Sequence, residues 1–369
     1  MEKRIVNIIR SLSIDMIEEA RSGHPGICLD AAPIMYTLFS KHLVFNVNDP
    51  LWLNRDRFIL SAGHGSALLY STLFLAGYSI KEHELRTFRQ INSRLSGHPE
   101  LNKEIGIETT TGPLGQGFAN AVGIAIGEDY LRNNINSELF NFNTYCLVGD
   151  GDLMEGISSE VASLAGSLKL GKLIVLYDSN NVSLDGRTDG VFDENVVQRF
   201  ESYGWHTETV ANGEDIDAID KAINDAKNIV DRPSLIQVKT IIGVGSKDQG
   251  TNKVHGKPLD EKDVATIKQK LGVNPYPFHI SSEPIQYFRS EIAKRNNARY
   301  NSWFGKYNDL VSKDLNLAKN ISYLKNGNLK INLCNLVINK TGGTEELRVS
   351  NEKIMNLIRS ITPLYIGGS

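Results

Sequence analysis

The stretch that decides the fold lies at residues 143–181: NTYCLVGDGDLMEGISSEVASLAGSLKLGKLIVLYDSNN. It contains two short apolar runs, Asn143–Val148 and Leu173–Tyr177, separated by a helical segment at 158–168. Continuous apolar runs of this length are typical of strands in a parallel sheet, where both faces are covered. The stretch therefore predicts a strand, a crossover helix and a second strand parallel to the first.

The same alternation continues on both sides of this unit. Further strands are predicted at Phe58–Ser61, Trp205–Val210 and Ser234–Thr240. Helices are predicted at 1–22, 30–43, from Ser66 onward, at 116–131, up to 200–203 and at 215–229. This order predicts an α/β fold with a parallel sheet flanked by helices on both faces. The helix at 116–131 is rich in glycine and alanine, so we expect it to be buried and tightly packed.

The composition changes near Asn274, where the sequence Asn-Pro-Tyr-Pro interrupts the pattern. We predict a first domain over residues 1–273 and a linker over 274–346. The linker should contain a long helix at 284–317 and an irregular segment at 324–346. Residues 347–369 would begin another domain, with a helix at 354–361 and a strand at 364–366 that leads into Gly-Gly-Ser.

Composition narrows the class of protein. The chain has 369 residues, a net charge of −3 and 41% apolar residues, which argues against a dedicated nucleic-acid or membrane surface. No apolar stretch approaches the ~18 residues of a membrane span, and the N-terminus lacks a signal core. Cys28, Cys146 and Cys334 are too widely spaced to predict a disulfide framework or a zinc site. We expect a reduced, cytoplasmic protein.

Polar residues follow both central strands. Gly149-Asp150-Gly151 comes directly after the first, and Asn180 comes after the second. Ligands of open parallel sheets bind beyond the carboxyl ends of the strands, and side-chain oxygens suit Mg²⁺ or Ca²⁺. A backbone carbonyl just after Asn180 would complete the protein's share of the ligands. Each motif alone is compatible with an ordinary turn, but the pair indicates a metal site.

Four of the eight histidines, His24, His64, His98 and His255, are adjacent to glycine. Each alone would more often be a loop or capping residue. Together they indicate imidazoles that face one cleft, where they bind hydroxyls or phosphate or transfer protons near neutral pH. Their spacing matches no zinc motif. The remaining histidines are interpreted as structural: His42, His83, His206 and His279.

The segment 112–117, Gly-Pro-Leu-Gly-Gln-Gly, predicts a rigid turn that opens the glycine-rich helix. A backbone carbonyl in this turn would accept a hydrogen bond, and Leu114 would press on a flat ring. An ordinary helix entry is the simpler alternative. The chain has neither a GxGxxG dinucleotide fingerprint after its first strand nor a GxxxxGK[ST] phosphate loop.

These motifs resemble those of a known family. The Gly-Asp-Gly motif followed about thirty residues later by asparagine resembles the thiamine diphosphate motif. Six segments occur in the order found in transketolases: SGHPG, SAGHGS, SGHPE, TTGPLGQG, GDGDLMEG and VHGKPL. They span His24 to Leu259, and the likeness continues to the last residue.

The resemblance implies specific roles. The metal, Mg²⁺ or else Ca²⁺ or Mn²⁺, would be bound by Asp150, Asn180 and the carbonyl of Val182, and would bridge the protein to the diphosphate of the cofactor. The cofactor, thiamine diphosphate, would contact His64, Gly112, Leu114, Gly151, Asn180, Leu184 and His255.

The resemblance also assigns residues to the substrate. His24 and His255 would be catalytic, and the substrate would contact His24, His98, His255 and Arg348. Arg348 is assigned because it lies nineteen positions before Gly367, although the surrounding segment is a loose match. Glu155 would lie at the dimer interface.

Transketolases of the pentose phosphate pathway transfer a two-carbon ketol unit from a ketose phosphate to an aldose phosphate. The family forms homodimers whose sites lie between two chains. The resemblance implies that this chain carries the diphosphate half and ends at the start of the pyrimidine-binding domain. We therefore expect residues 1–369 alone to be inactive.

Three alternatives remain open. The chain could be the diphosphate-binding subunit of a split transketolase that works with a complementary C-terminal subunit. It could have a sister activity, such as dihydroxyacetone synthase or deoxyxylulose-phosphate synthase. It could also be a non-catalytic paralogue that retains the cofactor contacts.

Overall fold

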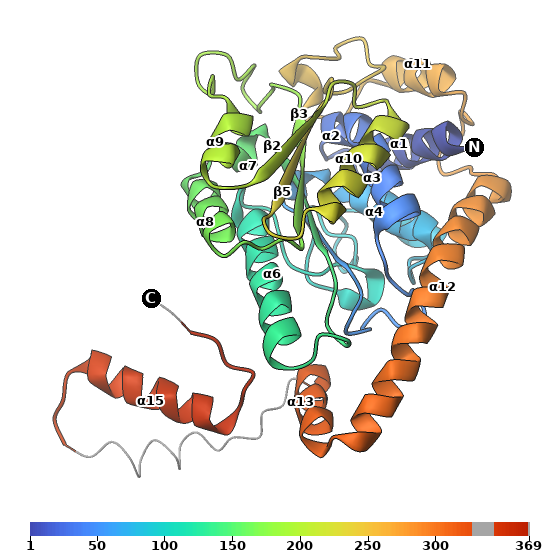
Figure 1. The fold of residues 1–369 in the computed structure, drawn as a ribbon. Helices are drawn as coiled ribbons and strands as arrows, with labels where there is room; N and C mark the ends of the chain where they lie inside the picture. Colours follow the sequence, from blue (N-terminus) through green and yellow to red (C-terminus); the bar gives the residue numbers. More distant parts are fainter. Residues whose placement is uncertain (327–342, 368–369) are drawn as a thin grey trace. The chain divides into compact units, whose positions relative to one another are not determined.

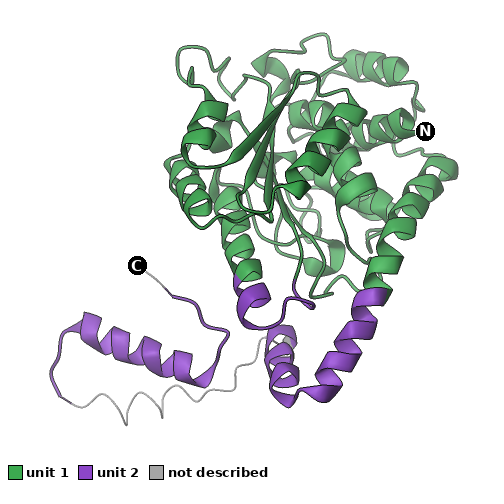
Figure 2. Ribbon diagram, in the orientation of Figure 1, with its two compact units in different colours: residues 1–129, 141–301 green, residues 130–140, 302–369 purple. Residues whose placement is uncertain are grey.

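The computed structural model describes residues 1–326 and 343–367. The chain divides into two compact units, 1–129 with 141–301 and 130–140 with 302–369 (Figure 2). The larger unit contains the whole sheet. The unit boundaries after residues 129 and 301 fall within helices, at Gln116–Asn134 and Ser282–Lys313. The domain boundaries predicted at residues 273 and 346 stay predictions.

The sheet has five strands, all parallel, in the order β1-β2-β3-β5-β4. Their bounds are β1 Arg57–Leu60, β2 Thr144–Gly149, β3 Leu173–Ser179, β4 His206–Val210 and β5 Ser234–Lys239. In the register of the central pair, Gly149 lies beside Asp178. The predicted parallel sheet is therefore confirmed, and the carboxyl ends of β2 and β3 are neighbours.

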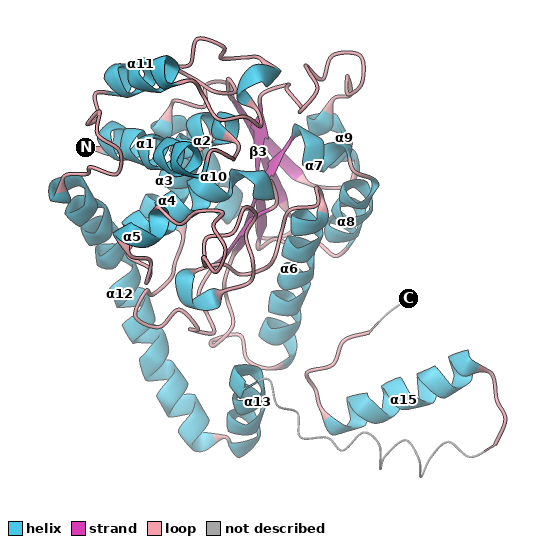
Figure 3. Ribbon diagram, turned by 180° about the vertical axis from the view of Figure 1, so that it is seen from behind, coloured by secondary structure: helices cyan, strands magenta, loops and turns pink. Residues whose placement is uncertain are grey.

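Alternate residues of each strand enter two different cores. Tyr145 and Leu147 of β2 belong to one hydrophobic cluster, whereas Cys146 and Val148 belong to the other. Helices cover both faces of the sheet, as Figures 1 and 3 show from opposite sides. The first core is built mainly by α1 (Glu2–Ala20), α2 (Pro25–Asp30), α3 (Ala32–Thr37), α4 (Ser66–Ala76) and α10 (Ile216–Asn228). The second is built by α6 (Gln116–Asn134), α8 (Gly156–Ser167) and α9 (Val196–Ser202).

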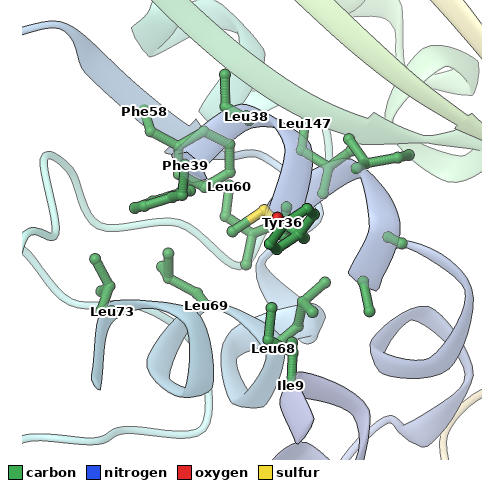
Figure 4. Packing of buried hydrophobic residues seen from close by; sticks show 14 of the residues in the cluster. Ile9, Tyr36, Leu38, Phe39, Phe58, Leu60, Leu68, Leu69, Leu73 and Leu147 are labelled. Carbon is green, nitrogen blue, oxygen red and sulfur yellow. The ribbon is translucent and has the colours of Figure 1, made fainter. Parts of the chain in front are cut away.

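The first core is densely filled by large side chains. Figure 4 shows Tyr36 of this core between Leu147 of β2 and Leu68 of α4, and Phe39 beside Phe58 of β1. The remaining elements are η1 (Leu38–His42), η2 (Gly63–Gly65), α5 (Glu82–Leu85), η3 (Lys103–Ile105), α7 (Asp150–Met154), η4 (Asn252–Val254), α11 (Glu261–Leu271), α12 (Ser282–Lys313), α13 (Leu315–Asn326) and α15 (Leu347–Ile361). None of the helices in the described part of the chain is both long and apolar enough to cross a bilayer.

Three helix predictions need correction. The helix predicted at 30–43 begins at Ala32, because α2 ends at Asp30 and Pro33 lies in the first turn of α3, which continues directly into η1. The helix predicted at 284–317 divides at Asp314, whose carboxylate accepts hydrogen bonds from the first turn of α13. The helix predicted at 354–361 already begins at Leu347.

The strand predicted at 364–366 is wrong. The chain forms a turn at 363–364 and has no regular secondary structure at 365–367, and among the described residues no strand pairs with it. An apolar run becomes a strand only where a neighbour supplies its hydrogen bonds. Most of the irregular segment predicted at 324–346 lies outside the described residues.

The smaller unit is held by aromatic contacts. The indole N–H of Trp303 donates to the carbonyl of Leu139 at 2.9 Å, and the ring stacks on Tyr307 with centroids 5.1 Å apart. The ammonium of Lys325 lies 4.4 Å from the centre of the Tyr307 ring. These contacts link the ends of α12 and α13 to the segment that follows α6.

The glycine-rich helix α6 is buried on one face only. A Cβ added to Gly117 would lie 2.5 Å from Cα of Ser61, so the start of α6 can approach the end of β1 only with glycine there. In contrast, a Cβ added to Gly123 or Gly127 would meet nothing within 4 Å. The prediction of a buried, tightly packed helix is therefore confirmed for the face that carries Phe118 and Ala121, which packs on the sheet.

This difference gives a matched pair of variants. We predict that Gly117→Ala lowers the free energy of unfolding by about 1–3 kcal/mol, because the methyl group would displace backbone. Gly123→Ala, in the same helix, should raise it by about 0.5–1 kcal/mol, because alanine loses less conformational freedom than glycine. Urea denaturation measures both changes. Equal effects of the two substitutions would contradict the packing described for α6.

Candidate functional site

A cavity of about 320 Å³ opens at the carboxyl ends of β2 and β3. The structure places most of the predicted metal and cofactor residues on its wall. Those that line it are His64, Leu114, Asp150, Gly151, Asn180, Val182, Leu184 and His255, together with Glu155, which was predicted for the dimer interface. Residues from five separate segments thus meet at one place, where open parallel sheets bind their ligands.

Asp150 is held rigidly at the end of β2. The Tyr177 hydroxyl donates to Oδ1 at 2.5 Å, and the N–H of Asn181 donates to Oδ2 at 2.9 Å. The N–H of Asn180 lies 3.3 Å from the same oxygen. The carboxyl is buried, and this burial raises its pKa from the ordinary value, although the hydrogen bonds favour the charged form. A nearby cation would stabilise that charge.

Asn180 is surrounded by polar partners at the end of β3. Its amide nitrogen donates to Oδ2 of Asp30 and to Oδ2 of Asp178, both at 3.1 Å. Its amide oxygen accepts from the N–H of Val182 at 3.0 Å. Burial raises the pKa of Asp178 to about 7.

The donor set fits a hard cation. Within residues 1–326 and 343–367, no group of three or more His, Cys, Asp or Glu side chains has the arrangement of a metal site. The expected ligands are instead one carboxylate, one amide and one backbone carbonyl, all oxygens, which suits Mg²⁺ or Ca²⁺. Oδ1 of Asp30, buried close to this set, has no hydrogen-bond partner.

The carboxylate of Asp152 joins three segments around the cavity. Its Oδ1 accepts from the Ser61 hydroxyl at 2.6 Å and from the N–H of Gly115 at 2.8 Å. Its Oδ2 accepts from the N–H of Gly149 at 3.0 Å. The end of β1, the turn at 112–117 and the end of β2 are therefore fixed by one buried side chain.

Glycines allow the segments of this wall to approach closely. A Cβ added to Gly151 would lie 3.0 Å from Cδ1 of Leu114, and one added to Gly63 would lie 2.8 Å from the backbone nitrogen of Gly112. Any larger residue would fill the space beside Leu114. The absence of side chains on these glycines leaves the apolar side chain of Leu114 accessible next to the polar end of β2. Such a surface fits a ligand with a flat ring and an anionic group.

The four glycine-flanked histidines lie together, as predicted. The ring centroids of His24 and His64 are 5.2 Å apart, and those of His24 and His255 are 5.9 Å apart. The rings of His64 and His255 stack at 5.2 Å, and His98 lies 6.2 Å from His24. Four loops that are distant in sequence therefore present imidazoles to one place.

Burial keeps these imidazoles neutral. It lowers the pKa of His24 to about 4, with smaller effects from His255, Arg89 and His98. It also lowers the pKa values of His64, His98 and His255. Neutral imidazoles can both donate and accept hydrogen bonds, which suits contact with sugar hydroxyls.

Arg89 was not predicted as a site residue. Its guanidinium donates to the Ser22 hydroxyl at 3.0 Å and to the carbonyl of Gly97 at 3.2 Å, and it lies 3.4 Å from Nδ1 of His24. Because a guanidinium only donates, Nδ1 must accept, and the neutral ring of His24 carries its proton on Nε2. Asp30, Asp152, Tyr177 and Asp178 were likewise not predicted as site residues.

Three predicted residues are exposed. Arg348 lies in the smaller unit, where it is exposed and pairs with Glu346 at 2.5 Å. Leu184 lines the cavity but is 63% exposed. Glu155 is also exposed at the rim. The described residues that line the cavity do not include Gly112, His24 or His98, although both histidines belong to the cluster with His64 and His255.

The sequence was compared with known proteins. Residues 1–330 match the family model described as transketolase, thiamine diphosphate binding domain. The chain belongs to the transketolase family. It is 44% identical over 376 residues to a probable transketolase of Streptococcus pneumoniae, covering 100% of this chain and 57% of the relative. It is also 44% identical over 378 residues to the transketolase of Bacillus subtilis, covering 100% of this chain and 56% of the relative.

Solved transketolases share this fold. The enzyme from Leishmania mexicana superposes with a TM-score of 0.92 at 37% identity, covering 98% of this chain and 55% of that one. A Pichia stipitis transketolase complex with sedoheptulose-7-phosphate superposes with a TM-score of 0.86 at 41% identity, covering 90% and 50%. The chain thus spans little more than half the length of the transketolases it matches.

Because burial lowers the pKa of His24, the free energy of unfolding should depend on pH. The pKa of His24 is about 4 in the fold but about 6.5 when unfolded, so between these values the unfolded chain binds more protons. The free energy of unfolding should therefore fall as the pH drops from about 7.5 to 4.5. The variant His24→Gln lacks this proton and should lose less stability over that range.

Thermal melting between pH 4.5 and 8 measures this difference. His83→Gln, which changes an exposed histidine outside the cluster, is the control and should follow the wild type. Melting curves of His24→Gln that run parallel to the wild type at every pH would contradict a neutral, buried His24.

Proposed function

We propose that this chain carries the diphosphate-binding half of a transketolase site, which transfers a two-carbon ketol unit from a ketose phosphate to an aldose phosphate. One observation carries the proposal. In a chain that belongs to this family, Asp150, Gly151 and Asn180 line one cavity together with His64 and His255.

The residues divide by chemistry. Asp150, Asn180 and the carbonyl of Val182 would bind Mg²⁺, with Ca²⁺ or Mn²⁺ as substitutes, because all three offer oxygen. The N–H of Gly151 and the ring of His64 would contact the diphosphate. Gly112, Leu114 and Leu184 would face the rings of thiamine diphosphate. When bound, that cofactor supplies an electron sink at the carbon–carbon bond that is broken.

The other histidines would act on the sugar. In the tautomer fixed by Arg89, His24 offers an N–H at Nε2 for a substrate hydroxyl. His255 lines the cavity, and its Nδ1 has no hydrogen-bond partner, so this nitrogen is available to bind or transfer a proton. His98 and Arg348 would bind the substrate, Arg348 through its phosphate.

The rest of the site would come from outside the described residues. We propose a homodimer in which Glu155 lies at the interface, and a complementary C-terminal subunit would fill the same role in a split enzyme. Residues 1–369 alone would then show no ketol transfer. The buried, free thiols of Cys28 and Cys146 are consistent with a reducing compartment such as the cytoplasm.

The metal ligands can be tested by binding. We predict that Asp150→Ala and Asn180→Ala each abolish Mg²⁺-dependent binding of thiamine diphosphate in the whole protein, because a lost oxygen ligand leaves the diphosphate charge uncompensated. Titration with the cofactor, with and without Mg²⁺, measures this. Asp185→Ala is the control, since Asp185 is an exposed carboxylate on the same cavity outside the ligand set. Wild-type affinity in both test variants would refute the site.

The histidines should separate into two classes. His24→Ala and His255→Ala should lower turnover by about 10²-fold or more while changing cofactor affinity less, because both would act on the substrate. His64→Ala should mainly weaken cofactor binding. Steady-state kinetics of the whole protein with ketose and aldose phosphates, paired with cofactor titration, distinguish the two classes of histidine. A His64→Ala variant with normal cofactor affinity and no turnover would reverse the assignment.

A further inference from the structure

We propose that Asp30 is a positioning residue for the metal site: it fixes the side-chain amide of Asn180 so that the amide oxygen faces the cation. The inference rests on the proposed function, because it takes Asn180 as a ligand. Asp30 does not line the cavity, so it would act through Asn180 and not as a ligand. Asp30 ends helix α2, far in sequence from the strands that supply the proposed ligands.

The geometry around Asn180 leaves its amide one orientation. Two carboxylates, those of Asp30 and Asp178, each place an oxygen 3.1 Å from the amide nitrogen. On the opposite side, the backbone N–H of Val182 donates to the amide oxygen at 3.0 Å. A flipped amide would direct oxygen at two carboxylates and nitrogen at a donor, which satisfies none of the three contacts. The remaining lone pair of the amide oxygen stays available for a cation.

Hydrogen bonds from Arg10 fix the helix turn that carries Asp30. The guanidinium of Arg10 donates to the carbonyl of Leu29 at 2.5 Å and also to Glu214, which fixes the last turn of α2. Asp30 is 2% exposed and Asp178 is 1% exposed, and the Thr240 hydroxyl donates to the second oxygen of Asp178. The second oxygen of Asp30, in contrast, has no hydrogen-bond partner.

This contrast assigns Asp30 a function. Burying two carboxylates side by side costs free energy, and Asp178 already receives hydrogen bonds on both oxygens. Among the described residues, the side chain that donates a hydrogen bond to Asp30 is that of Asn180, and Oδ1 of Asp30 has no partner. Groups that orient a metal ligand typically change metal affinity by about 10- to 100-fold when removed. The buried carboxylate is therefore explained by the ligand that it orients.

The experiment measures the Mg²⁺ concentration that gives half-maximal binding of thiamine diphosphate to the whole protein, followed by tryptophan fluorescence. Asp30→Ala should raise this concentration roughly tenfold. Asp30→Asn should stay within about threefold of the wild type, because its carbonyl oxygen can still accept from Asn180. Cys28→Ala is the control for local disruption, since Cys28 is buried in the same helix and does not line the cavity; it should leave the Mg²⁺ dependence unchanged.

Thermal melting in the presence of a chelator checks that each variant folds, and Asp30→Ser replaces Asp30→Ala if the latter does not. An Mg²⁺ dependence of Asp30→Ala equal to the wild type would overturn the proposal, and so would an Asp30→Asn variant as impaired as Asp30→Ala. Asp150→Ala separates the two levels of the argument. If Asp150→Ala leaves the Mg²⁺ dependence unchanged, the proposed metal site is wrong. If Asp150→Ala abolishes cofactor binding while Asp30→Ala leaves the Mg²⁺ dependence unchanged, only the role of Asp30 is wrong.

Discussion

The buried carboxylate of Asp152 is the contact on which the site depends. It accepts hydrogen bonds from the end of β1, from the turn before α6 and from the end of β2. Each donor would otherwise be a buried polar group without a partner, at about 1–3 kcal/mol apiece. Because these three segments are far apart in sequence, no local preference could hold them together. The cavity exists because one side chain satisfies all of them.

The parallel sheet determines which residues meet at the site. In a parallel sheet the carboxyl ends of neighbouring strands meet at one edge, so the residues after β2 and β3 are brought together by register alone. Asp150 and Asn180 are therefore adjacent although α7, α8 and β3 lie between them in sequence. Loops from both sides of the sheet then add the four histidines, whose burial keeps them neutral. The result is a cavity with a polar end that can bind an anion and an apolar wall that carries imidazoles.

Much of this arrangement was predictable from the sequence. The continuous apolar runs of β2 and β3, each ending in polar residues, predicted the strands, and Asp150 and Asn180 follow them directly. Asp30 and Arg89 were missed for a physical reason: Asp30 lies among apolar residues of a buried helix, and Arg89 lies in a segment without periodicity, so neither position carries a local signal. The break between α2 and α3 was predictable from Pro33, whereas the strand at 364–366 failed because pairing depends on a neighbour that the local sequence does not specify.

The most direct test of the account is a crystal structure of the whole protein with thiamine diphosphate and Mn²⁺, in which anomalous scattering locates the metal. The account predicts one cation bound by the Asp150 carboxylate, the amide oxygen of Asn180 and the carbonyl of Val182, each at about 2.1 Å, with the diphosphate on its far side. A cation peak away from these three oxygens, or an Asn180 amide turned with its nitrogen toward the metal, would contradict it.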